Sequence, residues 1–330
     1  MRGWCYTVAG EAVDVLELGE IETPALAAGE VRVRVARSSV NPTDAKRRAT
    51  GRELASLGRI TPHNDGAGII EAVGTDVDEK SIGQRVWIFG AQHGRPHGTG
   101  AEMCTVPEGY AQPLPDALSM ADGACLGVPA VTAYAALFSD GPIAGQTVLV
   151  TGGAGRVGRY AVQMAAAAGA RVVATAGNDD NLAVCRDLGA ETAASYRDGN
   201  WAAGLRETLG GGVDRVVDPE FGANIDAISG LLNPNAVIAS YASDAVPAPS
   251  VAFNPLMLIN TTIKAVNIYA MPAGFRAEAL TAVSRMIAGG DLSHAVDRVL
   301  PFDQLPAAHQ ATEAGGTRGA VQVDIDGSIT

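Results

Sequence analysis

The sequence predicts an α/β protein in which a doubly wound parallel sheet is joined to a smaller β-rich domain. From about Leu118, helix-like stretches alternate with short apolar strands, as in β-α-β units of a parallel sheet. Before that point, short strands are separated by frequent Gly and Pro, which is typical of a compact, partly closed barrel. A glycine-rich loop between a strand and a helix then locates a ligand site within the second domain.

Length and composition restrict the class of protein. The 330 residues are 47% hydrophobic and 18% charged, as in a soluble globular protein of about two domains. A net charge of −12 argues against nucleic-acid or anionic-membrane partners, which select basic surfaces. We also find no signal-peptide core and no membrane-spanning apolar run. The dispersed Cys5, Cys104, Cys125 and Cys185 are interpreted as reduced thiols, and we expect a cytoplasmic location.

In the first domain we expect strands rather than helices over residues 4–40. Residues 31–35 alternate strictly between Val and Arg, as a half-buried strand does. Pro42 is well placed to start a short helix through Arg48. Further expected elements are a strand over 69–73 and a turn with a strand over 82–88.

A strand, a glycine loop and a helix follow one another between residues 147 and 168. The loop places glycines at 152, 155 and 158, with Arg156 and Val157 among them. Glycines let the backbone turn tightly and approach a pyrophosphate, whose charge then lies at the positive end of the helix. The next strand, residues 171–175, completes a β-α-β unit, so we predict a dinucleotide site here.

The remaining pattern completes the second domain and returns to the first. Residues 261–268 are β-branched and suit an edge strand, 276–288 suit a helix, and the strand-like 321–323 suggests that the tail rejoins the first domain. Other expected strands of the parallel sheet are 148–150, 172–175, 213–217 and 236–240. We therefore expect a catalytic domain over 1–121, a dinucleotide-binding domain over 122–262, and a return segment over 263–330.

Several landmarks, taken in order, give the chain a family resemblance. They are Asn41-Pro42-Thr43-Asp44, Asn64-Asp65-Gly66-Ala67-Gly68, Gly83-Gln84-Arg85-Val86, the run from Leu126 to Tyr134, the glycine loop, and Thr317-Arg318-Gly319. The chain resembles the zinc-independent quinone oxidoreductases (zeta-crystallin branch) of the medium-chain dehydrogenase/reductases. The resemblance implies a GroES-like partial barrel, a Rossmann domain, and a nicotinamide cofactor.

Compared with the zinc-dependent branch, the expected metal ligands are replaced. Where Cys, His and Cys would stand, this chain has Asn41, Asn64 and Val128. A valine cannot ligate zinc, and neutral amides are poor substitutes for thiolate or imidazole. His93 and His97 lie in a glycine-rich loop with no obvious third ligand, so we expect no metal.

The end of the second Rossmann strand favours NADPH over NADH. An acidic residue that binds the ribose hydroxyls of NAD is typical there, but this chain has Ala176, followed by Gly177 and Asn178. Without an acidic side chain at this position, no carboxylate there repels the 2′-phosphate of NADPH. Asn181 stands where the resembled family often has a phosphate-binding lysine, and Tyr196 and Arg318 resemble family positions at the cofactor.

Without a metal, hydride must pass to a small-molecule acceptor that is already electrophilic, such as a quinone or a conjugated enone. Asn41 is the best candidate for orienting nicotinamide or acceptor, and it also suits the helix cap. Asp44 is expected to hold a nearby arginine or a backbone amide. Asn64 borders the pocket or belongs to a turn, and Thr132 resembles the family residue under the nicotinamide.

Two late segments lie where ligands of parallel sheets gather. Ser240-Tyr241 ends a Rossmann strand, and Asn267 with Tyr269 occupies a comparable place. Tyr134 and Tyr269 are the only tyrosines considered as proton donors, with packing as the alternative. The expected cofactor-binding residues are thus Thr132, Gly152, Gly155, Arg156, Val157, Gly158, Gly177, Asn178, Asn181, Tyr196, Ser240, Tyr241, Asn267, Tyr269 and Arg318.

Three functions remain open at this point. The first is NADPH-dependent quinone reduction by a homodimer, in which the edge segment 261–268 pairs with its twin. The second is reduction of α,β-unsaturated carbonyls or enoyl thioesters. The third, of a different class, is NADPH binding with little catalysis, because fold and cofactor site alone do not define activity.

Overall fold

The computed structural model describes residues 1–330, and the chain divides into two compact units. Unit 1 contains residues 1–128 and 280–330, and unit 2 contains residues 129–279. Strand β13 (Thr262–Ala265), where the return segment was expected to begin, pairs within the sheet of unit 2. Helices α5 (Gly127–Phe138) and α11 (Ala273–Gly289) each contain one division point.

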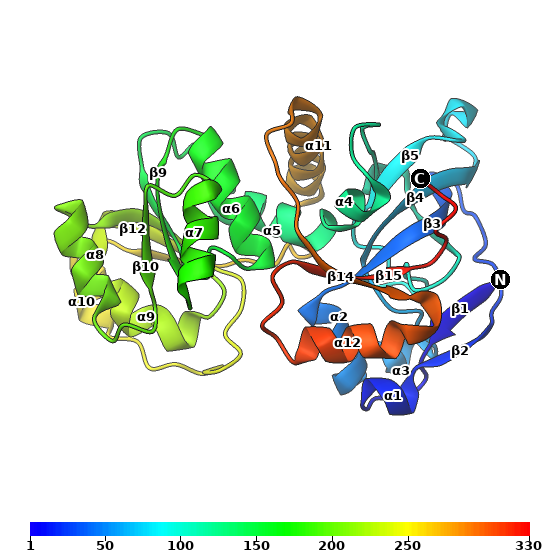
Figure 1. Cartoon of the computed structure of the whole chain (residues 1–330), viewed down its shortest axis with the longest axis horizontal. Helices are drawn as coiled ribbons and strands as arrows, with labels where there is room; N and C mark the ends of the chain where they lie inside the picture. The colour runs from blue at the N-terminus through cyan, green and yellow to red at the C-terminus, as the bar shows by residue number, and fades with distance from the viewer. The chain divides into compact units, whose positions relative to one another are not determined.

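Unit 1 is built on a seven-stranded sheet that both ends of the chain form (Figure 1). Its strands are β3 (Glu30–Val40), β4 (Asp65–Val73), β5 (Arg85–Ile88), β6 (Met103–Pro107), β7 (Ala111–Pro113), β14 (Val296–Pro301) and β15 (Ala320–Asp324). Its helices are α1 (Ala12–Val15), α2 (Pro42–Thr50), α3 (Leu54–Leu57), α4 (Met120–Ala124) and α12 (Leu305–Glu313). A separate two-stranded sheet pairs β1 (Arg2–Cys5) with β2 (Glu17–Glu20).

Strand β3 organises this sheet. It pairs with β4 along one edge, and β6 and β15 share the other, β6 beside residues 30–34 and β15 beside residues 37–40. Register shifts in its pairing with β4 accompany this change of partner, as expected for a bent strand. The pairing of β15 with β3 confirms that the tail returns to the first unit.

One local expectation for this unit is wrong. Residues 12–15 form helix α1, although strands were expected throughout 4–40. The reason is tertiary: Ala12 and Val15 are buried in a cluster with Leu305 and Ala308 of α12, residues that lie far away in the sequence. The helix that follows Pro42 extends to Thr50 and ends where Gly51 adopts a left-handed conformation, φ 67°.

Unit 2 is a doubly wound parallel sheet, as predicted. Its strand order is β10-β9-β8-β11-β12-β13, and every neighbouring pair is parallel. The further strands are β8 (Thr147–Val150), β9 (Arg171–Ala176), β10 (Thr192–Ser195), β11 (Val213–Asp218) and β12 (Leu232–Ser240). The order reverses between β8 and β11, which is where ligands bind open parallel sheets.

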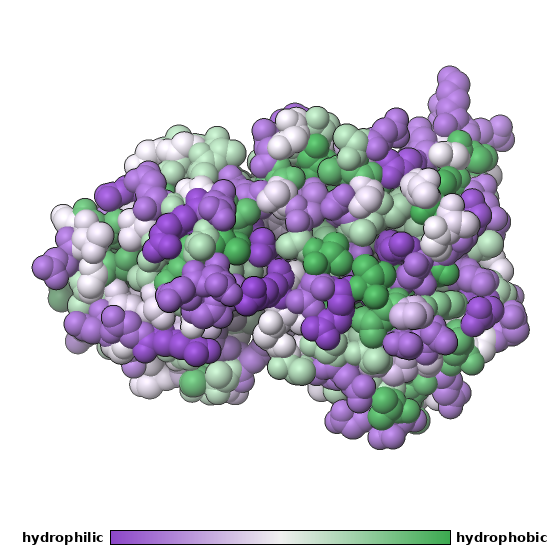
Figure 2. Space-filling view, in the orientation of Figure 1, coloured by the Kyte–Doolittle hydropathy of each residue, from purple (hydrophilic) through white to green (hydrophobic).

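Helices cover both faces of this sheet. Trp201 of α8, Ile225 of α9 and Leu256 of α10 pack into one buried cluster with Leu149 of β8 and Val216 of β11, while Figure 1 shows α6 and α7 on the opposite face. The helices are α6 (Arg156–Ala167), α7 (Asp179–Asp187), α8 (Trp201–Leu209), α9 (Phe221–Ser229) and α10 (Phe253–Leu258). The visible surface of this unit is largely hydrophilic, with small apolar groups (Figure 2). No helix in residues 1–330 has the length and apolar character needed to cross a bilayer.

Candidate active site

A first candidate site, in unit 1, forms where β3 passes into α2. Pro42 occupies the first turn of the helix, where its missing N–H leaves no bond unmade, and Asn41 is the N-cap residue. The backbone N–H of Asn41 donates to Oδ2 of Asp44 at 2.8 Å. A backbone amide, one of the partners expected for Asp44, is therefore among its contacts, whereas Arg48 pairs with Glu313.

Asn64 and Asp65 lie against this helix start. Asn64 Nδ2 donates to Asp44 Oδ1 at 2.7 Å, and Asn41 Nδ2 donates to Asp65 Oδ2 at 2.6 Å. All four side chains are buried. Asn41, Asp44, Asn64 and Asp65 thus form an amide–carboxylate cluster in which each carboxylate receives hydrogen bonds from amide groups.

The cluster also contacts the first turn of α5 through Asp65. Both carboxylate oxygens of Asp65 lie 2.9 Å from the backbone nitrogen of Val128. A Cβ atom on Gly127 would lie 2.0 Å from Asp65 Oδ1, so this approach requires a glycine. A carboxylate at a helix N-terminus is stabilised by the unpaired N–H groups and the helix dipole.

The three positions expected to replace zinc ligands are therefore brought together in unit 1. Asn41 and Asn64 both direct their Nδ2 groups to carboxylates, and Val128 contributes only its backbone N–H. This donor set does not fit zinc, which prefers thiolate, imidazole or carboxylate ligands. Within residues 1–330, no group of three or more His, Cys, Asp or Glu side chains could hold a metal ion.

A second candidate site, in unit 2, is the glycine loop between β8 and α6. Gly152 has φ 63°, a left-handed conformation that favours glycine. A Cβ on Gly158 would lie 2.3 Å from the carbonyl oxygen of Gly152. Gly155 is the N-cap residue of α6 and has no side chain, so no side-chain cap covers the first helical turn, which contains Arg156, Val157 and Gly158. The loop fits a pyrophosphate.

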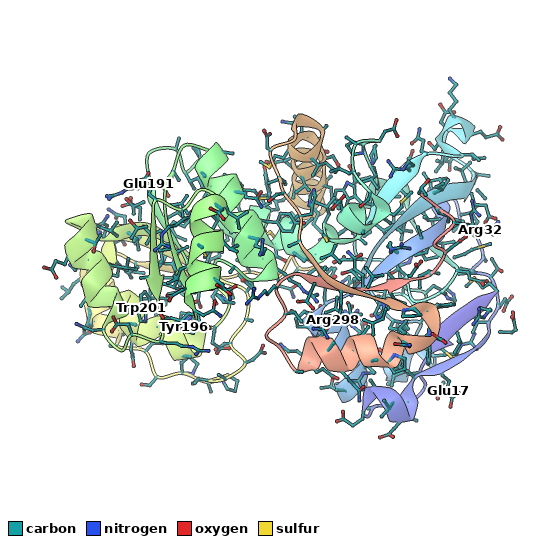
Figure 3. All side chains as sticks on the ribbon, in the orientation of Figure 1. Glu17, Arg32, Glu191, Tyr196, Trp201 and Arg298 are labelled. Carbon is teal, nitrogen blue, oxygen red and sulfur yellow. The ribbon has the colours of Figure 1, made fainter.

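Most other expected cofactor residues lie at the same edge of the sheet, just beyond the strands' carboxyl ends. Gly177 and Asn178 follow β9, and Tyr196 follows β10 (Figure 3). A Cβ on Gly177 would lie 2.5 Å from the Tyr196 hydroxyl. Asn178 caps α7, because its Oδ1 accepts the N–H of Asn181 at 2.9 Å. Ser240 and Tyr241 stand at the end of β12, and Asn267 and Tyr269 follow β13.

Two expected residues are placed differently. Thr132 is buried in α5, in the part of that helix that belongs to unit 2. Arg318 precedes β15 in unit 1, where its backbone N–H donates to Asp297 Oδ1 at 2.8 Å. Arg318 is thus in a different compact unit from the glycine loop.

Two carboxylates were missed as site residues by sequence reasoning. Asp65 was quoted only within a motif, and its partner Val128 lies 63 residues further along the chain. Asp218, buried at the end of β11, accepts bonds from Thr151 Oγ1 at 2.5 Å and Ser240 Oγ at 3.2 Å. Asp218 therefore links the ends of β8, β11 and β12 beside the glycine loop. Its signal was its position directly after the predicted strand 213–217, at the carboxyl end where ligands of parallel sheets gather.

Tyr134 and Tyr241 are held by different surroundings in unit 2. The Tyr134 hydroxyl donates to Glu278 Oε1 at 3.1 Å, and its ring packs against Phe138 and Phe275. Burial, reinforced by the charge of Asp218, raises the pKa of Tyr241 above its ordinary value. A phenol with a raised pKa holds its proton more tightly.

The fold and the site define a class of protein, and comparison with known families agrees. Residues 27–116 match the family described as "Alcohol dehydrogenase GroES-like domain", and residues 157–287 match "Zinc-binding dehydrogenase". A GroES-like unit joined to a parallel dinucleotide-binding sheet is the architecture of the medium-chain dehydrogenase/reductases.

Within that class the chain belongs to the quinone oxidoreductase branch. It is 30% identical to "Quinone oxidoreductase" of Homo sapiens over 223 residues, 67% of each chain. It is also 30% identical to "2-methylene-furan-3-one reductase" of Solanum lycopersicum over 253 residues, 71% of this chain and 63% of that protein. The matched regions span 62% of the rodent quinone oxidoreductases. A solved mycobacterial structure complexed with NADPH has 25% identity, a TM-score of 0.84, and covers 98% and 99% of the two chains.

Proposed function

We propose that this chain is a zinc-independent reductase that transfers hydride from NADPH to a quinone. The observation that carries the proposal is the amide–carboxylate cluster at the positions where zinc ligands were expected. NADPH supplies the hydride when bound. With no Lewis acid from this donor set, the acceptor must be electrophilic by itself, as a quinone is.

The chain's own residues contribute binding and orientation. The glycine loop and the first turn of α6 hold the pyrophosphate, and Asp218 fixes the strand ends beside them. Asn41 presents an amide whose Nδ2 is held by Asp65, so the group is fixed before a ligand arrives. Such preorganisation lowers the entropy lost on reaching the reactive geometry. The protons that complete quinone reduction come from solvent.

The test follows NADPH oxidation with an ortho-quinone in the presence of a metal chelator. We expect saturable turnover that the chelator does not reduce and that Asn41→Ala lowers by tenfold or more, about 1.4 kcal/mol of transition-state binding. Asn200→Ala is the matched control, because the Asn200 side chain makes no capping hydrogen bond. Absence of turnover while NADPH still binds would reject quinone reduction.

The proposed preference for NADPH over NADH rests on the end of β9. Ala176, Gly177 and Asn178 carry no carboxylate, and Asn178 caps α7; the nearest carboxylates in sequence are Asp179 and Asp180, in the first turn of that helix. We expect tighter binding of NADPH than of NADH by fluorescence titration, and Ala176→Asp should reverse the order. Equal affinities in the natural protein would contradict the preference.

Reduction of conjugated carbonyls is the second candidate, favoured by the similarity to the tomato reductase named above. The same electrophilic requirement applies to an enone. Comparing kcat/KM for an ortho-quinone, an enone and an enoyl thioester separates the candidates. Tight NADPH binding with negligible turnover on all three would favour the remaining alternative, a cofactor-binding protein with little catalytic role.

We also propose that the chain forms a homodimer through unit 2. Strand β13 is an edge strand of the parallel sheet, and its Ile263 is 46% exposed. Large apolar side chains on the adjacent α10 are more exposed still, with Phe253 at 69%, Met257 at 54% and Leu258 at 80%. An open strand edge beside exposed apolar groups suits a self-complementary contact.

A further inference from the structure

Four buried polar side chains form a hydrogen-bonded chain that includes His63, the residue before Asn64 and Asp65. His309 of α12 and His63 are joined through their Nε2 atoms at 2.9 Å. His63 Nδ1 lies 2.7 Å from Ser38 Oγ, and Ser38 Oγ lies 2.7 Å from Thr99 Oγ1. All four side chains are fully or almost fully buried. None of them belongs to the site described above.

The last member of the chain fixes the direction of every hydrogen bond. Thr99 Oγ1 lies 2.7 Å from the carbonyl oxygen of Asp65, which only accepts, so Thr99 must donate. Ser38 must then donate to Thr99. The Ser38 oxygen is thereby left to accept from His63 Nδ1–H, and the unprotonated Nε2 of His63 must accept from His309 Nε2–H.

Two independent features agree with this direction. Burial lowers the pKa of His63 to about 3 and lowers that of His309 well below its ordinary value, so both rings are neutral near pH 7, as one donor and one acceptor nitrogen per ring require. His309 Nδ1 has no hydrogen-bond partner in the chain. The assigned direction leaves a lone pair there, whereas the opposite direction would leave a buried N–H, which is rarer in proteins.

The backbone that these four side chains support is strained at His63. His63 has φ 80°, a left-handed conformation that is unfavourable for any residue other than glycine. Such a conformation persists only where surrounding contacts determine it. The carbonyl of His63 accepts the N–H of Thr99 at 3.1 Å, and that of Asn64 accepts the N–H of Ala91 at 2.9 Å. The next two side chains, Asn64 and Asp65, are those that meet Asp44 and Asn41.

We propose that His309 is a positioning residue that, through the chain His309–His63–Ser38–Thr99, sets the 63–65 backbone so that Asn64 and Asp65 assemble the amide–carboxylate cluster. The inference deepens the proposed function and rests on it for its kinetic consequence. By this inference, the C-terminal part of the polypeptide is necessary for the geometry of the amide–carboxylate cluster. His309 lies 246 residues after His63 in the sequence.

The test compares His309→Gln, which keeps an N–H donor near the Nε2 position, with His309→Met, which removes it. We expect kcat to fall by tenfold or more in His309→Met and to be largely retained in His309→Gln. NADPH affinity should not change in either variant, because the glycine loop belongs to unit 2. Equal loss of kcat in both variants, at equal thermal stability, would overturn the proposal.

A spectroscopic measurement separates this inference from the proposed activity. Nitrogen-15 shifts should show the Nδ1–H tautomer of His63 in the natural protein, and hydrogen exchange of the Asn64 side-chain amide should accelerate in His309→Met but not in His309→Gln. Ser38→Ala, which breaks the hydrogen bonds between His63 and Thr99, should reproduce the acceleration if His309→Met fails to fold. Unchanged Asn64 exchange in folded Ser38→Ala or His309→Met would reject the positioning role whether or not quinones are reduced.

Discussion

Asp65 illustrates how a single buried carboxylate can organise a site. Moving a carboxylate from water into a protein is unfavourable unless hydrogen bonds replace its hydration. Here Asn41 Nδ2 and the N–H of Val128 supply such bonds, and the start of α5 adds a favourable dipole. The side chain thereby links helix α2 to helix α5 in unit 1, and removal of its charge should affect both.

An asparagine has one acceptor oxygen where an aspartate has two. We therefore expect Asp65→Asn to place its NH2 group against one of the existing donors, Asn41 Nδ2 or the N–H of Val128. The unfolding free energy should fall by about 1–3 kcal/mol, the usual effect of leaving a buried group unsatisfied. Quinone turnover should fall with it, while NADPH affinity stays the same. Glu71→Gln is the control, since Glu71 is on the same strand but 40% exposed at the side chain. Unchanged stability and turnover in Asp65→Asn would contradict the assignment.

The buried imidazoles predict acid sensitivity. Because the pKa of folded His63 is lowered to about 3 from 6.5, the unfolded chain binds a proton there that the folded chain does not. Stability is therefore full above pH 6.5 and is lost as the pH falls from 6.5 toward about 3. His309 adds to this effect, because burial, His63 and Arg48 all lower its pKa.

Chemical denaturation at several pH values checks this expectation. His309→Gln, which removes one of the two imidazoles, should show a shallower loss of unfolding free energy between pH 7 and 5. A natural protein whose unfolding free energy is constant over that range would show that the two rings do not titrate as their burial requires.

At the scale of elements, the helix α6 depends on a backbone contact that only glycine allows. A methyl group on Gly158 would lie 2.3 Å from the Gly152 carbonyl oxygen and force the loop away from the helix start. We expect Gly158→Ala to raise the Kd of NADPH by about tenfold or more, equivalent to 1.4 kcal/mol. Gly204→Ala in α8 is the control, because nothing lies within 4 Å of its added Cβ. Comparable affinity in Gly158→Ala and the natural protein would contradict the cofactor role of the loop.

The elements also show what a sequence can and cannot predict. The glycine loop and its β-α-β setting were predictable because strand, loop and helix are contiguous, and each residue type has a local reason. The short helix α1 was missed because its helical conformation depends on α12. The contact of Asp65 with Val128, and that of His63 with His309, join residues far apart in the chain, so no periodicity or spacing announces them.

At the scale of the whole molecule, the exposed edge of unit 2 leads to a prediction about assembly. Ile263→Lys places a charge on edge strand β13 and should convert a dimer into a monomer in sedimentation at micromolar concentration. Val13→Lys is the control, because Val13 is an apolar residue of unit 1 with 59% exposure. A natural protein that sediments as a monomer would remove the proposed dimer.

The split of unit 1 between the two ends of the chain has a consequence for biosynthesis. Residues 129–279 are contiguous and are made before the tail, so unit 2 can fold while the ribosome is still translating residues 280–330. During that interval the edge of β3 that pairs with β15 stays unpaired, and the hydrogen bond between His63 and His309 is not yet formed. The nascent protein thus acquires its cofactor unit first and its amide–carboxylate cluster last. Slow translation or truncation near residue 300 should therefore leave unit 2 folded while unit 1 still lacks β15 and the His309 contact.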